Sequence, residues 1–291
     1  EERANLVFVA MGRYGGRECS YASDADVIAV HEAVGGASDA EAAASATAIV
    51  NRVKSLLGSA TSQLGIVVDL DLRPEGKNGP MSRTIESHRE YAQRWASTWE
   101  RQAAVRARPI GEGKLADRAR ELFAELAYGG VSESDVRDIR LLKARMENER
   151  LPRGSEPARH VKLGPGGLSD VEWTIQLIQM RHGREVEGLR TPSTTRAIAV
   201  ARDAGLLAAP DAEILLSAWD LATRIRAGNT LATGRMSGVK LDVVPRDSAE
   251  LAALAAILGY GSGGLTALEE DWLRAARQAR GVMERTFWEQ Q

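Results

Sequence analysis

Length, composition and charge narrow the class of protein before any motif is considered. The chain has 291 residues, of which 44% are hydrophobic and 27% charged, values typical of a soluble globular protein with room for about two domains. A formal net charge of −2 argues against a nucleic-acid-binding surface, and no apolar run approaches the ~18 residues that span a membrane. The single cysteine, Cys19, excludes an internal disulfide and fits a reducing, cytoplasmic location.

Strand-like and helical patterns alternate up to about residue 80. The apolar runs "NLVFVAMG", "DADVIAVH" and "QLGIVVDLDLRP" predict three strands. The alanine-rich stretch from Asp39 to Gly58 predicts a helix that ends at its glycine. Strand, glycine turn, strand, helix and strand together indicate an α/β layer.

A long helical stretch begins at about residue 83. The segment 83–108 predicts one amphipathic helix, in which Tyr91, Trp95 and Trp99 recur every fourth residue on one face. We expect this aromatic face to be buried in the core; a platform for stacked bases is the alternative.

Beyond residue 109 nearly every segment has a helical pattern. Ser132 and Asp135 have the spacing of a capping box and predict a helix start. Further helices are expected near residues 193–204, 211–228, 248–258 and 265–288. We therefore expect an α+β protein, with a small mixed-sheet domain over residues 1–110 followed by an all-α helical bundle over residues 111–291.

Two aspartates stand where a buried strand begins. In "GRYGGRECSYASDADVIAVH", Asp24 and Asp26 flank one alanine ahead of an apolar run, and alternation along a strand places both side chains on the same face. Carboxylates this close repel one another, and Mg²⁺, which prefers oxygen ligands and substrate phosphates, relieves the repulsion. The alternative is an Asx-rich turn that caps the strand.

Glycines lie close to this pair of carboxylates. Gly15 and Gly16 precede it, and glycine allows positive φ and a close approach of the backbone to an anion. Ser23 adds a hydroxyl at the same edge. A triphosphate beside a metal ion would fit such a turn.

The third predicted strand supplies further carboxylates. Asp69 and Asp71 in "VVDLDLRPEGKNGP" share a strand face, so geometry alone does not choose between them as the third ligand of a two-metal site. Arg73 and Lys77 follow the strand, where they either hold phosphate charge or lie in a solvated turn.

The segment "GRYGGRECSYASDADVIAVH" resembles the nucleotidyltransferase signature of the polymerase β superfamily, and more narrowly that of the glutamine synthetase adenylyltransferases. The family pattern Gly-Arg-x-Gly-Gly-x-Glu-x-x-Tyr-x-Ser-Asp-x-Asp is matched at every fixed position. The segments "VDLDLRPEGKNGP", "WASTWERQAAVRARPI" and "KLGPGGLSDVEWTIQ" resemble the family's second, third and fourth motifs. The likeness covers about residues 6 to 182, and the remainder matches only as a helical bundle.

The resemblance implies a nucleotidyltransferase domain that uses ATP and two Mg²⁺ ions, with Asp24, Asp26 and Asp69 as catalytic metal ligands. It favours Asp69 over Asp71, a position at which the broader family often has arginine. It also implies transfer of AMP from ATP to a tyrosine of glutamine synthetase, with release of pyrophosphate. A PII-type signal protein is implied as a regulator, acting through the full-length enzyme.

Four alternatives remain open. They are removal of AMP by phosphorolysis, nucleotidyl transfer to RNA ends, transfer to another signalling protein, and an inactive regulatory binding module. Family enzymes usually carry two such units, and "ARGVMERTFWEQQ" resembles a terminal helix, which favours the C-terminal, AMP-attaching half. Because the chain starts at Glu1 and almost at once enters an apolar strand, we expect it to be a piece of a longer protein. Near-neutral charge argues against RNA, and the complete set of carboxylates argues against an inactive module.

Two roles are possible for the polar residues of the fourth motif, one structural and one functional. Ser169 and Glu172 have capping-box spacing, which predicts a helix start at which Glu172 reaches back to the Ser169 N–H. In the functional account, Asp170 and Glu172 reach toward the nucleotide or the acceptor tyrosine. Lys162 and Asp71 then either contact the acceptor as well or hold the residues that do. In both accounts, replacing Asp170 should barely change stability, because a carboxylate gains little from the first helical turn.

Overall fold

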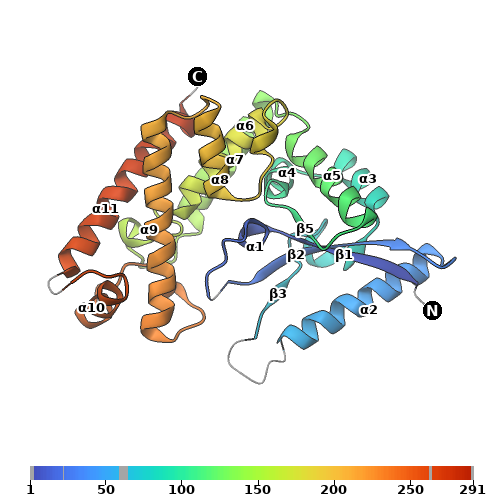
Figure 1. Ribbon diagram of the computed structural model, residues 1–291, viewed down its shortest axis with the longest axis horizontal. Helices are drawn as coiled ribbons and strands as arrows, with labels where there is room; N and C mark the ends of the chain where they lie inside the picture. The colour runs from blue at the N-terminus through green and yellow to red at the C-terminus, as the bar shows by residue number, and fades with distance from the viewer. Residues whose placement is uncertain (1–2, 22, 59–64, 262–263, 290–291) are drawn as a thin grey trace. The chain divides into compact units, whose positions relative to one another are not determined.

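The computed structural model describes residues 3–21, 23–58, 65–261 and 264–289, and the chain divides into two compact units (Figure 1). The first unit comprises Glu1–Cys19, Ser23–Val131 and Arg190–Ser193, and the second comprises Ser20–Ala22, Ser132–Leu189 and Thr194–Gln291. The first unit holds a mixed sheet and the second is almost wholly helical, so the predicted α+β class is confirmed. The first unit continues past the predicted boundary at residue 110.

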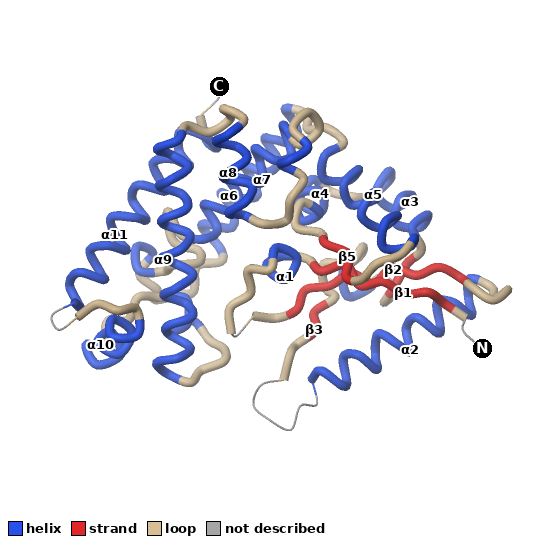
Figure 2. Tube along the Cα trace, viewed as in Figure 1, coloured by secondary structure: helices blue, strands red, loops and turns tan. Residues whose placement is uncertain are grey.

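A five-stranded mixed sheet forms the centre of the first unit (Figure 2). β1 (Ala4–Ala10) pairs antiparallel with both β2 (Ala25–Ala33) and β5 (Arg108–Ile110). β3 (Val68–Asp69) and β4 (Ser82–Arg83) both run parallel to β2 along its other edge. The predicted strand over "DADVIAVH" is therefore confirmed as the central β2, which is buried as its apolar run requires.

Helices lie on both faces of this sheet (Figure 1). α2 (Asp39–Gly58) has the predicted bounds, and it packs on β1 and β2 through Ala42, Ala46 and Val50, which recur every fourth residue. α5 (Lys114–Tyr128) covers the opposite face together with α3 (Ile85–Arg94).

The single helix predicted over residues 83–108 is wrong. The chain breaks after α3, and α4 (Thr98–Ala104) starts at a capping box in which Ser97 and Glu100 bond each other's backbone. Because of this break, the four-residue aromatic repeat does not lie on one continuous helical face. Trp95 and Trp99 are 72% and 42% exposed, so the expectation that they belong to the core is wrong as well.

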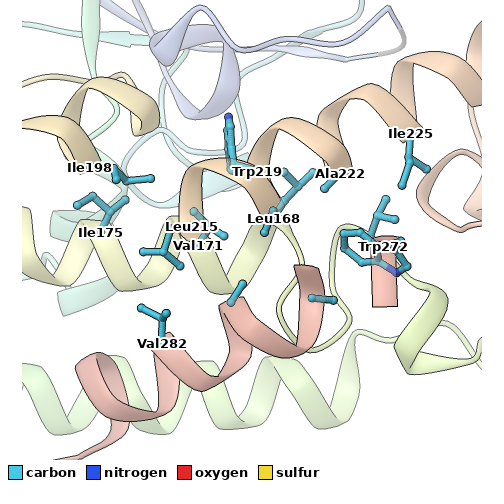
Figure 3. Packing of buried hydrophobic residues seen from close by; sticks show 14 of the residues in the cluster. Leu168, Val171, Ile175, Ile198, Leu215, Trp219, Ala222, Ile225, Trp272 and Val282 are labelled. Atoms are coloured by element: carbon cyan, nitrogen blue, oxygen red, sulfur yellow. The ribbon is translucent and has the colours of Figure 1, made fainter. Parts of the chain in front are cut away.

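Among its described residues the second unit has six α-helices. They are α6 (Glu133–Glu149), α7 (Leu168–His182), α8 (Thr194–Asp203), α9 (Ala209–Thr233), α10 (Ser248–Ile257) and α11 (Gly264–Met283). Five of them, α7 to α11, share one hydrophobic core. α9 packs against α7, α8, α10 and α11. Figure 3 shows the side chains that fill the space between them, among them Val171, Ile175, Leu215, Trp219 and Trp272.

These helices confirm the sequence predictions for this part of the chain. The capping box of Ser132 and Asp135 starts α6, and the helices expected from the pattern are present with ends shifted by a few residues. Within the described residues, no helix combines the length and the apolar character needed to cross a membrane.

A buried histidine is expected to make the stability of the first unit depend on pH. His88 on α3 is 3% exposed and its ring lies 6.0 Å from that of Phe123 on α5. Burial, together with the nearby positive charge of Arg83, lowers the pKa of His88 to about 4. The unfolded chain takes up this proton near pH 6.5, whereas the native protein resists it.

We therefore expect the free energy of unfolding to fall by about 3 kcal/mol through this group as the pH drops from 7 to 4. The contribution is fully present above pH 6.5 and is lost toward pH 4, the lowered native pKa. Urea denaturation of wild type and His88→Gln over this pH range measures it, since the variant should lack this part of the pH dependence. Parallel pH curves for the two proteins would show that His88 carries no such effect.

Candidate active site

The glycine-rich segment forms a single helical turn, α1 (Gly12–Gly16), between β1 and β2. A β-carbon on Gly15 would lie 1.8 Å from the carbonyl oxygen of Arg106, so only glycine fits there. Positive φ occurs at Gly12 (+51°) and Arg17 (+59°), not at the glycine pair for which it was expected. Gly15 and Gly16 thus serve close backbone packing, and the Gly15 N–H donates to the Met11 carbonyl within the turn.

Asp26 and Asp69 are directly opposite one another on neighbouring parallel strands. Their Cα atoms are register partners in the β2–β3 pairing, and strands so paired lie about 4.8 Å apart with matched side chains on the same face. The pairing continues one residue earlier, where the Ala25 N–H donates to the Val67 carbonyl at 2.8 Å. Asp24 directly precedes β2 and is exposed. The sheet thereby brings the carboxylates of the first and second motifs to one edge.

Asp69 and Asp71 do not share a strand face, contrary to the sequence expectation. β3 ends at Asp69, and Asp71 lies in the turn that follows. Oδ1 of Asp69 accepts a hydrogen bond of 2.6 Å from the Asp71 N–H, while the Asp71 carboxylate lies 3.3 Å from Nζ of Lys77. Because the strand ends between them, Asp69 and Asp71 lie in different surroundings, which the alternation of side chains along a strand could not predict.

Arg73 holds the loop after β3 in shape. Its guanidinium is buried and donates to the carbonyls of Leu70, Lys77 and Gly79 at 2.9–3.2 Å. All three of its nitrogens therefore bind this loop, which weakens the case for Arg73 as a phosphate ligand. The side chain of Lys77 is 82% exposed, so its ammonium group can reach a ligand.

Two arginines of the third motif donate hydrogen bonds to backbone carbonyls of α1. Arg106 forms a buried ion pair with Glu18 at 2.6 Å and donates from Nε to the Gly12 carbonyl at 3.0 Å. Arg108 donates to the carbonyls of Tyr14 and Gly15. Sequence reasoning missed these contacts, although a fixed glutamate in the first motif and two arginines in the third were available as a signal.

Two family models match successive parts of this chain. Residues 1–122 match the family model described as glutamate-ammonia ligase adenylyltransferase, and residues 140–287 match the one described as GlnD PII-uridylyltransferase. The bifunctional glutamine synthetase adenylyltransferase/adenylyl-removing enzyme of Streptomyces coelicolor is 47% identical over 286 residues, which cover 97% of this chain and 28% of that protein. The enzyme of the same name from Bifidobacterium longum subsp. infantis is 44% identical over 292 residues, 99% of this chain and 27% of that protein.

The chain belongs to the glutamine synthetase adenylyltransferase family. This finding confirms the resemblance drawn from the motifs. The chain spans little more than a quarter of the length of these adenylyltransferase relatives.

The donor set suits the Mg²⁺ that an adenylyltransferase would need for ATP. Mg²⁺ is usually held by one or two carboxylates together with waters and substrate phosphates, and the Asp26–Asp69 pair is the part of such a site that a protein supplies. Across residues 3–21, 23–58, 65–261 and 264–289, however, no three His, Cys, Asp or Glu side chains are already grouped to hold a metal ion. The fit therefore rests on two opposed carboxylates, with the exposed Asp24 two residues before Asp26 in the chain.

The adenylyltransferase-like fourth motif starts α7, but not by the predicted capping box. The N-cap is Gly167, so Ser169 lies inside the helix, and its N–H donates to the Lys162 carbonyl. The prediction that Glu172 reaches back to the Ser169 N–H is therefore wrong. Lys162 and Glu172 are half-buried, and their acceptor-side roles stay predictions.

Asp170 anchors a buried ion network in the second unit. Its side chain is 1% exposed and lies 2.5 Å from Nζ of Lys143 and 3.1 Å from Nη1 of Arg280. It also accepts a hydrogen bond of 2.8 Å from the Gly166 N–H, which fixes the loop before α7. The expectation that its replacement leaves stability unchanged rested on the helix dipole alone, and this buried network leads us to expect a loss of stability instead.

A sequence signal for this network existed. Lys143 continues the buried face of α6 after Val136 and Ile139, at helical spacing. A lysine on an apolar face needs a buried acid, since an unpaired buried charge is costly.

Proposed function

We propose that this chain transfers AMP from ATP to a tyrosine hydroxyl of glutamine synthetase in the cytoplasm, with release of pyrophosphate. The observation that carries the proposal is the in-register pairing of Asp26 with Asp69 beside the α1 turn. The identity of 47% to a bifunctional glutamine synthetase adenylyltransferase/adenylyl-removing enzyme supports this acceptor.

In this proposal the carboxylates of Asp24, Asp26 and Asp69 hold two Mg²⁺ ions. Bound there, Mg²⁺ would neutralise phosphate charge and lower the pKa of the attacking hydroxyl. The chain's own contribution is to hold the α1 turn, closely packed through Gly15 and Gly16, where the triphosphate would lie. Ser23 and the exposed Lys77 complete the phosphate contacts, and Arg73 shapes the loop that carries Lys77.

Labelled ATP tests the reaction directly. The 291-residue protein is incubated with Mg²⁺, unmodified glutamine synthetase and ATP labelled at either the α or the γ phosphate. We expect glutamine synthetase to become labelled from the α phosphate alone, because only AMP is transferred. Label from the γ phosphate would indicate a kinase, and no label from either would refute AMP transfer.

Removal of AMP is a second candidate, since the relatives are named as both adenylyltransferase and adenylyl-removing enzymes. The same carboxylates could serve phosphorolysis, in which phosphate attacks the AMP–tyrosine bond and ADP leaves. AMP-modified glutamine synthetase incubated with inorganic phosphate separates the two. Rapid ADP release by a protein that attaches no AMP would favour the second candidate.

A PII-type signal protein is the regulatory partner that we propose for the full-length enzyme. The match of residues 140–287 to a PII-uridylyltransferase model supports this choice. Addition of a PII-type protein to the full-length enzyme should change the rate of AMP transfer, and an unchanged rate would count against it. We propose no nucleic-acid or membrane partner.

The two carboxylates after Val68 should differ sharply in their effect on turnover. Asp69→Asn should lower the rate of AMP transfer about as strongly as replacing Asp26, since Asp69 lies opposite it in the sheet. Asp71→Asn should reduce the rate less than tenfold, because this carboxylate faces Lys77 in the turn. Steady-state rates of both variants measure the difference, and equal losses would mean that Asp71 shares the metal site.

A further inference from the structure

A series of contacts connects Arg106, a residue of the third motif just after α4, to the proposed metal ligand Asp26. The Arg106 side chain is 5% exposed and its ion partner Glu18 is 12% exposed, so little solvent screens this pair. A buried guanidinium requires such a partner, because an unpaired buried charge is strongly unfavourable. Ser193 adds a hydrogen bond of 3.3 Å from its hydroxyl to the second oxygen of Glu18.

Arg106 lies against both the first and the last residues of α1. Its Nε donates to the Gly12 carbonyl at the first residue of the turn, and its own carbonyl fills the space beside Gly15. A β-carbon on Gly16 would lie 2.7 Å from Nη2 of Arg106. The absence of side chains at the glycine pair is what lets one arginine reach all three residues.

Gly12 in turn contacts the carboxylate of Asp26. With φ at +51°, a β-carbon on Gly12 would lie 2.7 Å from Oδ2 of Asp26. The Met11 N–H donates to the Asp26 carbonyl at 2.8 Å, which fixes the start of the turn to β2. The position of Gly12 therefore limits where the Asp26 carboxylate can lie.

We propose that the Glu18–Arg106 ion pair is a positioning device that holds Gly12 against Asp26 and thereby sets the direction of this carboxylate toward a divalent cation. Arg106 touches neither the cation nor the substrate; it acts through Gly12. The inference rests on the proposed function in that it takes Asp26 as a metal ligand.

Conservative variants separate positioning from mere stabilisation. Arg106→Lys keeps a positive charge for Glu18 but loses the Nε hydrogen bond to Gly12. Gly12→Ala leaves the ion pair intact and disturbs Asp26 from the other side. Arg118→Lys is the matched control, because Arg118 also forms long-range ion pairs in the first unit, with Glu32 and Glu86, which both lie outside α1.

Cation binding is the readout that does not depend on turnover. Mn²⁺ is titrated into each protein in the presence of a non-hydrolysable ATP analogue, and free Mn²⁺ is followed by electron paramagnetic resonance. We expect the Mn²⁺ dissociation constant to rise at least fivefold in Arg106→Lys and in Gly12→Ala, and to stay at the wild-type value in Arg118→Lys. In the transfer assay, kcat should fall at least tenfold in the first two variants while KM for glutamine synthetase stays unchanged.

The outcomes distinguish this inference from the proposed function. Wild-type Mn²⁺ affinity in a folded Arg106→Lys would overturn the positioning role, even if its melting temperature falls. If Arg106→Lys does not fold, Gly12→Ala decides in the same way. A wild-type protein that binds Mn²⁺ and shows the expected variant pattern, yet transfers no AMP, would refute the proposed function and leave the positioning role intact.

Discussion

Asp26→Asn is expected to lower the rate of AMP transfer at least about a thousandfold while the protein stays folded. A bound metal contributes several kcal/mol of charge stabilisation at the transition state, and about 4 kcal/mol corresponds to three factors of ten in rate. Asparagine has nearly the same shape but no charge. The backbone pairing of residue 26 with Met11 and Asp69 needs no carboxylate and should persist.

Transfer of label from α-labelled ATP measures the rate, and a circular dichroism melting curve checks the fold. Asp117→Asn is the matched control, since Asp117 is an exposed carboxylate of the same unit that forms an ion pair with its helical neighbour Arg120. The control should keep its rate within about twofold, because an exposed ion pair is worth little. Asp24→Asn should resemble Asp26→Asn. If Asp26→Asn keeps more than a tenth of the wild-type rate, Asp26 is not a metal ligand.

Asp170→Asn is expected to destabilise the second unit by about 3 kcal/mol, the lower part of the range for breaking a buried ion pair. Its loss leaves the buried ammonium of Lys143 with Glu147 at 3.2 Å as its remaining acidic neighbour. It also removes an acceptor from Arg280 and from the Gly166 N–H, so the loop before α7 loses its anchor.

Urea denaturation followed by far-UV circular dichroism measures this loss. Asp220→Asn is the control, because Asp220 on α9 is exposed and its ion pair with Arg224 at 3.8 Å is a surface pair. The control should change the free energy of unfolding by less than about 1 kcal/mol. A wild-type urea midpoint for Asp170→Asn would mean that the buried network contributes nothing to stability.

Local sequence patterns predicted the parts of the site that depend on local structure. The apolar run after Asp26 identified β2, and the helical period of Asp39–Gly58 identified α2 with its bounds. The aromatic repeat misled, because the capping box of Ser97 and Glu100 starts a new helix and overrides the period. The signal for that break, a serine and a glutamate at capping-box spacing, is present in the sequence within the aromatic repeat.

The features of the site that the sequence did not predict depend on contacts between residues far apart in the chain. Asp69 and Asp71 look equivalent in the sequence, and only the end of β3, held by the loop that Arg73 closes, separates them. Asp170 looks like an ordinary first-turn carboxylate, but its partners Lys143 and Arg280 are 27 and 110 residues away in the sequence. No local propensity carries such information.

Diffraction from crystals grown with Mn²⁺ and a non-hydrolysable ATP analogue tests the central claim most directly, because anomalous scattering locates the metal without assumption. The account predicts a Mn²⁺ peak bound by the carboxylates of Asp26 and Asp69, with the phosphates of the analogue beside α1. A metal bound by Asp71 without Asp69, or a nucleotide held with no metal at Asp26, would contradict it.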